Sequence, residues 1–471
     1  MKQLARALLV SLALVCGASL FGPALLGVST ASAAPARRSL PAQTTKAPTR
    51  VSLLTMGPGD HPFARFGHTA LLLEWGDHTR VYNFGTFFFD GLQGVKDFMA
   101  GRFRYWLSVS DLQRTLAHYQ AEERSLIAQD LDLTRKQALQ LARLLEENAR
   151  PENRFYDYDY YKDNCTTRVR DVLDEVLGGA LRRSFQEPGS LTFREHTERL
   201  SAENLGLYVG LDIALGRFTD QVPTRFEELW VPDQLSAALD EVTLERGKRR
   251  VPLVRATRVL AETERPPSRE APPRWVPRFG LIGLALGACV AGLGHVAAGR
   301  VGSSPLGRRL LRARGAARAL FGGFAALLGL VAGLLGSVVF VFWFTKHWAA
   351  HQNSNVLLFA PWALALTYSG VRLALGQAGS AATTRRIAFA CVIAAVLGTL
   401  LPLLPGVGQD NLRLAALMVP LWGGLLLGAS ALAARAPLPA SDERASLTAT
   451  TAEPPPERSA PRDEPIAPET R

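Results

Sequence analysis

Five long apolar blocks dominate the second half of the chain. They cover, to within a few positions, residues 279–299, 320–344, 356–376, 386–404 and 412–434. Every block is close to the ~20 residues that an α-helix needs to cross the hydrocarbon core of a bilayer. We therefore expect a transmembrane domain of about five helices over residues 279–435. A polar, Pro-rich segment over 436–471 follows it and is typical of a disordered cytoplasmic tail.

A separate apolar stretch begins the chain. Lys2 and Arg6 lead into an apolar run, and the small residues "ASAA" follow it at 31–34. This order is typical of a secretory signal peptide over 1–34, with an uncleaved membrane anchor as the alternative. The segment 35–50, which contains Pro, Arg and Thr, then indicates a flexible linker.

The region 51–245 mixes strand and helix patterns. Two apolar-rich runs in "HTALLLEWGDHTRVYNFGTF" (68–87) flank a Gly-Asp pair, which predicts a β-hairpin. Two Ser/Thr–Gln pairs have the spacing of a capping box, which opens a helix. They are Ser110 with Gln113 and Thr134 with Gln137. We therefore expect one α+β domain over this region.

The arginines of the chain, whose net charge is +11, gather between the apolar blocks. They are Arg300, Arg308, Arg309, Arg312, Arg314 and Arg318 between the first two blocks, and Arg385 and Arg386 between the third and fourth. The positive-inside rule places these loops in the cytoplasm, so the 51–245 domain lies on the periplasmic side. Residues 246–278 are expected to link that domain to the membrane. Because membrane topology explains the charge, no nucleic-acid partner is expected.

Cysteine usage singles out one thiol. Cys16 lies in the expected signal peptide, and Cys289 and Cys391 lie in apolar blocks. Cys165 is therefore the single cysteine of the exported domain, and it has no disulfide partner there. Four scattered cysteines also do not have the spacing of a metal site. We expect neither a metal nor a cofactor.

The stretch "FYDYDYYKDNCTTRVRDVLD" (155–174) places this thiol at the start of a helix. Asn164 is a favourable N-cap, and apolar residues follow Cys165 at helical spacing until Gly178 and Gly179. The free N–H groups and the positive end of the helix dipole lower the pKa of a thiol, and the thiolate is the nucleophile. The same N–H groups can stabilise an oxyanion. A buried structural cysteine is the alternative.

A thiol nucleophile needs a base. The histidines of the exported domain are His61, His68, His78, His118 and His196. His68 begins an apolar strand directly after Gly67, where it can point at a helix N-terminus packed against that strand. A satisfied core histidine is the alternative for this residue. Asn83, on the next strand of the predicted hairpin, is the candidate for orienting His68.

Six segments have counterparts in one protein family. They are "FGHTALLL", "VYNFGTFFFD", "FRYWL", "EERSLIAQDLDLTRKQ", "NRFYDYDYYKDNCTTRVRD" and "HWAAHQNSNVLLFAPWAL". In these segments the chain resembles the Lnb-type bacterial lipoprotein N-acyltransferases. The order of histidine before cysteine is also similar to that of circularly permuted, NlpC-type papain-like folds. The resemblance implies that fold for residues 51–245, with Cys165 and His68 as the catalytic pair.

The resemblance also implies a multi-pass enzyme of the bacterial cytoplasmic membrane. It would move a fatty acyl chain from a phospholipid, through a Cys165 thioester, to the N-terminal amine of a diacylated lipoprotein. The residues expected to bind substrate are Asn164, Tyr158, Tyr160, His347, Asn353 and Asn355. Two alternatives stay open. They are a membrane-anchored papain-like cysteine hydrolase, either a peptidase or an amidase, and a non-catalytic sensor or scaffold.

Overall fold

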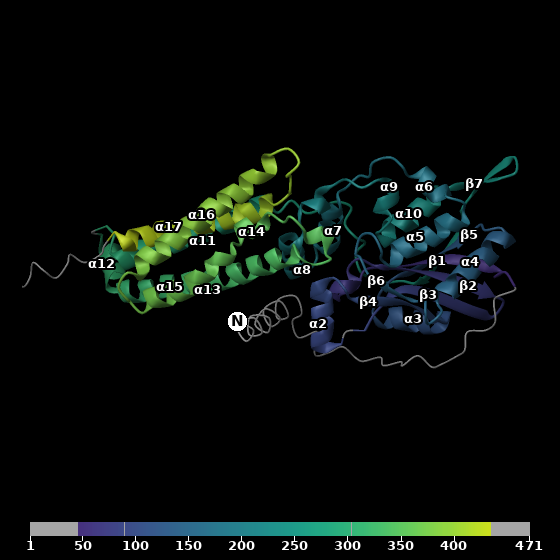
Figure 1. Cartoon of the computed structure of the whole chain (residues 1–471), viewed down its shortest axis with the longest axis horizontal. Helices are drawn as coiled ribbons and strands as arrows, with labels where there is room; N and C mark the ends of the chain where they lie inside the picture. Colours follow the sequence, from purple (N-terminus) through teal and green to yellow (C-terminus); the bar gives the residue numbers. More distant parts are fainter. Residues whose placement is uncertain (1–45, 89, 303, 435–471) are drawn as a thin grey trace, which may run out of the picture.

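The computed structural model describes residues 46–88, 90–302 and 304–434. The expected signal peptide, most of the expected linker after it and the expected C-terminal tail lie outside these residues. Figure 1 shows two parts arranged end to end along the long axis of the molecule. One is a mixed α/β domain built around a sheet, and the other is a bundle of long apolar helices.

Seven strands form one antiparallel sheet in the order β6-β4-β3-β2-β1-β5-β9. Their bounds are β1 (Arg50–Met56), β2 (His68–Trp75), β3 (His78–Thr86), β4 (Arg104–Ser110), β5 (Leu126–Leu131), β6 (Phe155–Asp157) and β9 (Val254–Ala261). A separate ribbon pairs β7 (Thr243–Arg246) with β8 (Arg249–Pro252). The strand that begins with the candidate base therefore lies at the centre of the sheet.

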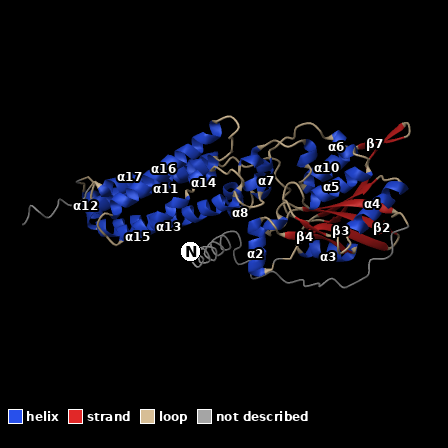
Figure 2. Ribbon diagram, viewed as in Figure 1, coloured by secondary structure: helices blue, strands red, loops and turns tan. Residues whose placement is uncertain are grey.

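Helices cover both faces of the sheet. The helices of this domain are α2 (Gly91–Ala100), α3 (Leu112–Ala121), α4 (Arg135–Asn148), α5 (Cys165–Val176), α6 (Ala180–Ser184), α7 (Phe193–Ser201), α8 (Leu205–Ala214), α9 (Arg225–Glu228) and α10 (Pro232–Glu241). Because side chains alternate along a strand, Leu71 and Leu73 of β2 pack with α4, α5 and α10, whereas Leu72 packs with Tyr119 of α3. Figure 2 shows α3 below the strands and α5 and α10 above them.

Most local signals predicted these elements correctly. The hairpin is confirmed, since β2 and β3 pair and Gly76 between them has φ +64°. The capping box of Thr134 and Gln137 is also confirmed. The helix start at Ser110 is wrong, because Ser110 ends β4 and Asp111 caps α3 with its side chain.

The structure differs from the expected linker over 246–278. Its first half forms β8 and β9, and β9 pairs with β5 at the edge of the sheet. The strand β5 precedes β9 by more than a hundred residues, and a pairing over that separation leaves no periodic signal in either segment alone. The sheet domain therefore extends to Ala261.

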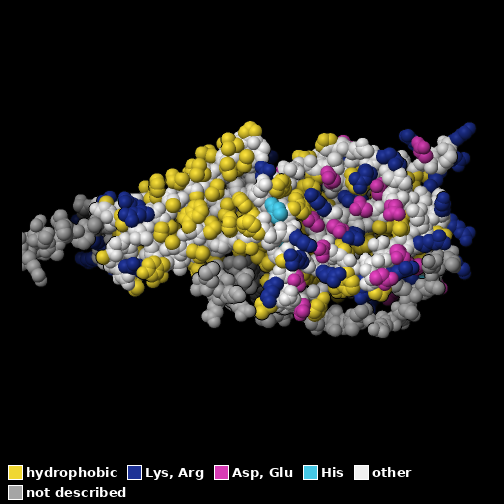
Figure 3. Space-filling view, in the orientation of Figure 1, with side chains coloured by type: hydrophobic (Ala, Val, Ile, Leu, Met, Phe, Trp, Pro, Cys, Tyr) yellow, Lys and Arg dark blue, Asp and Glu magenta, His cyan; other side chains and the backbone are white. Residues whose placement is uncertain are grey.

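The second part consists of the expected membrane helices. Their bounds are α11 (Val276–Ala298), α12 (Pro305–Arg312), α13 (Arg314–Phe342), α14 (Asn355–Leu358), α15 (Ala365–Ala374), α16 (Ser380–Leu400) and α17 (Leu412–Ala433). Within the described ranges, five spans are long and apolar enough to cross a bilayer, and α14 and α15 together form the third. Figure 3 shows apolar side chains over the bundle, and Lys and Arg gathered at the end away from the sheet domain. The protein is therefore a multi-pass membrane protein.

Glycines set the closest approach within the bundle, where α11 crosses α17. A Cβ atom added at Gly424 of α17 would overlap the backbone of Gly287 on α11. The neighbouring Gly423 faces open space, with no heavy atom within 4 Å of such a Cβ. Small residues at such crossings let two helix backbones pack directly against each other inside a membrane. The two adjacent glycines therefore form a natural pair of test and control positions.

We predict that Gly424→Ala lowers the free energy of unfolding of the detergent-solubilised protein by about 1–3 kcal/mol, because the added methyl group overpacks the crossing. Gly423→Ala keeps or slightly raises that free energy, since alanine favours a helix over glycine. Equilibrium unfolding in mixed micelles measures both variants. Equal losses for the two variants would contradict the packing argument.

Candidate functional site

The predicted helix start at Cys165 is confirmed. The Asn164 side chain accepts hydrogen bonds from the backbone N–H groups of Thr166 and Thr167, both at 2.8 Å. The Thr167 hydroxyl accepts in return from the Asn164 N–H at 2.7 Å, which completes a capping box. Cys165 is therefore the first residue of α5, at the positive end of the helix dipole.

Packing of α5 on β2 brings the thiol to His68. The hydroxyls of Thr69 on β2 and Thr166 on α5 lie 3.1 Å apart in the buried interface. Val169, one turn further along α5, is fully buried in the same core. His68, at the start of β2, is close enough to the Cys165 thiol that its charge and hydrogen bonding lower the pKa of that thiol. The structure thus brings together the two residues that the sequence singled out as nucleophile and base.

The electrostatics of this pair favour a thiolate. Burial raises the pKa of the Cys165 thiol, but the charge of His68 and its hydrogen bond outweigh that effect. Hydrogen bonds from the Thr166 hydroxyl and the Thr69 backbone lower the pKa further, to about 7. A buried thiol with this pKa is partly ionised at neutral pH, and the thiolate is the form that attacks carbonyl carbons.

A glycine keeps space open beside the sulfur. Gly85, at the irregular end of β3, has φ +84°, a conformation that L-amino acids with side chains rarely adopt. A Cβ atom there would lie 3.3 Å from Cβ of Cys165 and 3.6 Å from Cε2 of Tyr158. The ring of Tyr158 stacks on Tyr105, with 3.9 Å between the ring centroids. The approach to the thiol is therefore aromatic, and Tyr160 extends it, since its ring lies 5.3 Å from that of Tyr158.

Asn83 has other partners than the proposed base. Its side-chain amide donates to the Ser110 hydroxyl at 3.3 Å and to the Val81 carbonyl at 3.5 Å. The His68 ring instead lies against the ring of Tyr119, with 6.5 Å between the centroids. No hydrogen bond joins Asn83 to His68 among the described residues, so the orienting role of Asn83 stays a prediction.

Residues 40–199 match the family described as the Lnb N-terminal periplasmic domain. The chain is similar to that family over this segment. The matched segment contains both His68 and Cys165, so the resemblance read from the sequence is confirmed. No curated protein and no solved structure matches the chain.

The Lnb domain and the membrane bundle share a small pocket near the thiol. Tyr158 and Tyr160 line it on one side, and Lys346, His347 and Trp348 line it on the other. His347 Nε2 also lies 2.6 Å from a backbone carbonyl of the Lnb domain. Burial lowers the pKa of His347, so this ring is neutral near pH 7. Three residues expected to bind substrate thus share one pocket, although their contact with a substrate stays a prediction.

A larger pocket lies at the other end of β1, near Arg50 and Asp130. Its lining residues include neither a cysteine nor a histidine. Met56, at the opposite end of β1 from Arg50, pairs with His68 at the start of β2. Size alone therefore does not identify the site, because the chemistry lies at the opposite end of the strand.

Asn353 and Asn355 lie elsewhere, in a buried joint between α8 and the bundle. The Asn353 side-chain amide donates to the Ile213 carbonyl at 2.8 Å, and that of Asn355 donates to the Asp212 carbonyl at 2.9 Å. Both asparagines are fully buried. They hold the end of α8 against the start of α14, and the structure does not group them with Cys165. Their expected role in substrate binding therefore has no support from their position.

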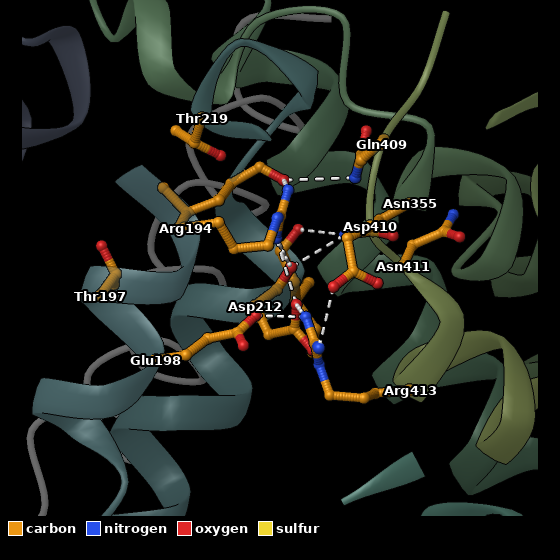
Figure 4. Close-up of polar contacts among 12 residues, drawn as sticks. Arg194, Thr197, Glu198, Asp212, Thr219, Asn355, Gln409, Asp410, Asn411 and Arg413 are labelled. Carbon is orange, nitrogen blue, oxygen red and sulfur yellow. Dashed lines mark hydrogen bonds and ion pairs between the residues drawn. The ribbon is translucent and has the colours of Figure 1, made fainter. Parts of the chain in front are cut away.

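The same joint contains an ion network that the sequence analysis missed. Arg194 of α7 and Arg413 of α17 both pair with Asp212 of α8, at 3.1 and 3.3 Å (Figure 4). Arg413 also pairs with Glu198, and with Asp410 at 3.0 Å. Burial raises the pKa of Glu198 to about 8, although Arg413 opposes this rise. An arginine at the start of an apolar span is the signal that points to such a network.

We predict that iodoacetamide alkylates Cys165 with a rate that rises with pH around a midpoint near 7, because the thiolate forms above the thiol pKa. In His68→Ala the midpoint shifts to about 8.5 or higher, since burial remains and the lowering contributions of His68 are lost. Peptide mass spectrometry separates Cys165 from the other cysteines. His118→Ala, which removes an exposed histidine, is the matched control. A midpoint that is the same in all three proteins would contradict the pairing of His68 with Cys165.

Proposed function

We propose that this protein is an acyltransferase of the bacterial cytoplasmic membrane. It moves a fatty acyl chain from a phospholipid, through a thioester on Cys165, to the N-terminal amine of a diacylated lipoprotein. The observation that carries the proposal is a buried, low-pKa Cys165 beside His68, in an Lnb domain docked on membrane helices. In this account the domain has the circularly permuted papain-like fold, with the histidine strand before the cysteine helix.

The first half-reaction loads the enzyme. His68 takes the proton of the Cys165 thiol, and the thiolate attacks the ester carbonyl carbon of the phospholipid. The backbone N–H of Cys165, the first residue of α5, stabilises the resulting oxyanion, while the N–H groups of Thr166 and Thr167 donate to Asn164. When the C–O bond breaks, His68 returns the proton to the leaving alkoxide. The products are the acyl thioester of Cys165 and a lysophospholipid.

The second half-reaction transfers the chain. The free amine of the lipoprotein attacks the thioester carbonyl, the C–S bond breaks, and His68 takes the proton that the amine loses. An amide forms, and protonation of the thiolate restores the starting state. The aromatic rings of Tyr158 and Tyr160 beside the sulfur support the transfer of an acyl chain, because they offer apolar surface next to the reacting carbon.

We expect the wild-type protein, expressed in a bacterial strain that lacks lipoprotein N-acylation, to increase the mass of lipoprotein N-terminal peptides by one acyl chain. Cys165→Ser abolishes this gain, because serine in this environment does not form the nucleophilic anion. Cys289→Ser keeps the mass gain, because this exposed cysteine lies in the membrane span α11 and not at the start of α5. Mass spectrometry of the peptides provides the measurement.

Two outcomes of this experiment would overturn the proposal. One is a mass gain that persists in Cys165→Ser. The other is the absence of a gain in the wild type together with cleavage of cell-wall peptides, which would favour the membrane-anchored cysteine hydrolase.

A further inference from the structure

Helix α2 exposes apolar side chains on the surface of the periplasmic domain. Leu92 is 68% exposed, and Phe88, just before the helix, is 62% exposed. Val95 and Met99 follow Leu92 at positions i+3 and i+7, so they continue the same face of the helix. A ten-residue helix with one apolar face needs a partner that covers this face.

The end of α2 is bound to the outer end of the second membrane span. The Ala100 carbonyl accepts a hydrogen bond from the Lys346 N–H at 3.3 Å, just beyond the end of α13. A Cβ atom at Gly101 would lie only 2.9 Å from Cβ of Lys346, so the two segments touch. Figure 1 shows α2 running across the direction of the membrane helices, close to the end of α13.

The exposed face of α2 is thereby continuous with the lipid-facing surface of the bundle. Near the outer end of α13, Phe340 and Val341 are exposed, and Phe344 is 75% exposed. These residues occupy the level at which α13 leaves the hydrocarbon core. A helix that lies across the span at this level is parallel to the membrane surface, which is the position of interfacial amphipathic helices.

A continuous line of aromatic rings connects α2 with the thiol. The ring of Phe98 in α2 lies 6.4 Å from that of Phe103, which lies 5.3 Å from Tyr105. Tyr105 stacks on Tyr158, and the edge of Tyr158 borders the space beside Cys165. The small pocket between Tyr158 and Lys346 lies along this line. Packed aromatic side chains, of which Phe103 and Tyr105 are buried, therefore extend from the membrane level to the reacting sulfur.

We propose that α2 lies in the outer leaflet of the bilayer and forms the wall past which a lipid acyl chain reaches Cys165. Its apolar face contacts the boundary between lipid headgroups and acyl chains. Lys96, exposed at position i+4 from Leu92, borders this face, and its long side chain extends to the headgroup phosphates. The position of the helix stands by itself, whereas its role as an entrance rests on the proposed acyl transfer.

The position is tested with spin labels in lipid nanodiscs. A label at Leu92→Cys is compared with labels at Phe344→Cys and at Val259→Cys, in a background that carries Cys165→Ser, Cys289→Ala and Cys391→Ala. Val259 is the matched control, because it is 57% exposed and apolar but lies on the edge strand β9. We expect residues 92 and 344 to collide more with dissolved oxygen than with a water-soluble nickel complex, and residue 259 to show the reverse.

An accessibility at residue 92 that matches residue 259 would overturn the position of α2. Protection of residue 92 from both relaxation agents would also overturn it, because that result indicates a protein partner or a second copy on this face. Neither readout requires catalysis, so this test is independent of the proposed acyl transfer.

The entrance role is tested with Leu92→Gln in the otherwise wild-type protein. We expect acylation of Cys165 by bilayer phospholipid to slow by about tenfold, because the burial of one leucine side chain in the leaflet is lost. In Leu92→Gln, the rate of Cys165 acylation by a water-soluble short-chain thioester stays unchanged. In Val259→Gln, the rates with both donors stay unchanged. Equal slowing with both donors would overturn the entrance role, since it indicates damage to the site. If neither donor acylates Cys165 in the wild type, that result would instead contradict the proposed function.

Discussion

The position of the reactive thiol relative to the bilayer depends on one buried ion network. Arg413 enters it from a membrane span, and Arg194 enters it from the periplasmic domain; both converge on Asp212. Removing one member of a buried pair leaves an uncompensated charge, which typically costs about 3–5 kcal/mol. The network therefore holds the two domains in one register, where a purely apolar contact would allow them to slide.

Short contacts connect this joint with the residues next to Cys165. Thr197, one turn from Arg194 in α7, shares a hydrogen bond of 2.9 Å with the Tyr161 hydroxyl. Tyr161 lies four residues before Cys165, and Asn164 donates to the Tyr160 carbonyl at 2.8 Å. The helix that presents the thiol is thus fixed to the sheet on one side and to the joint on the other. A transfer between lipid and protein requires both attachments. The sulfur must contact its base on the sheet and also lie close to the membrane.

The sequence predicted those features whose signals are local. The hairpin of β2 and β3, the five spans and the Asn164 cap each depend on residues within a few turns of one another. The contact of His68 with Cys165 crosses nearly a hundred residues, and it was reached through the family resemblance and the order of the two residues. Local reasoning therefore placed both elements, but packing between α5 and β2 decided their encounter.

What the sequence missed depends on contacts between distant segments. The pairing of β9 with β5 and the ion pair of Arg413 with Asp212 each join segments more than a hundred residues apart. Asn353 and Asn355 were expected at the substrate, because polar residues after a membrane span often meet ligands. In the structure their amides hold backbone carbonyls of α8, so their polarity serves the joint.

The most direct test of the central claim is the mass of the loaded enzyme. The purified full-length protein is placed in nanodiscs of phospholipid with deuterated acyl chains, without a lipoprotein acceptor, and is quenched in acid. The account predicts an intact-protein mass increase of one deuterated acyl chain, located on Cys165 and removed by neutral hydroxylamine. An unmodified protein, or an adduct that remains in Cys165→Ser, would contradict it.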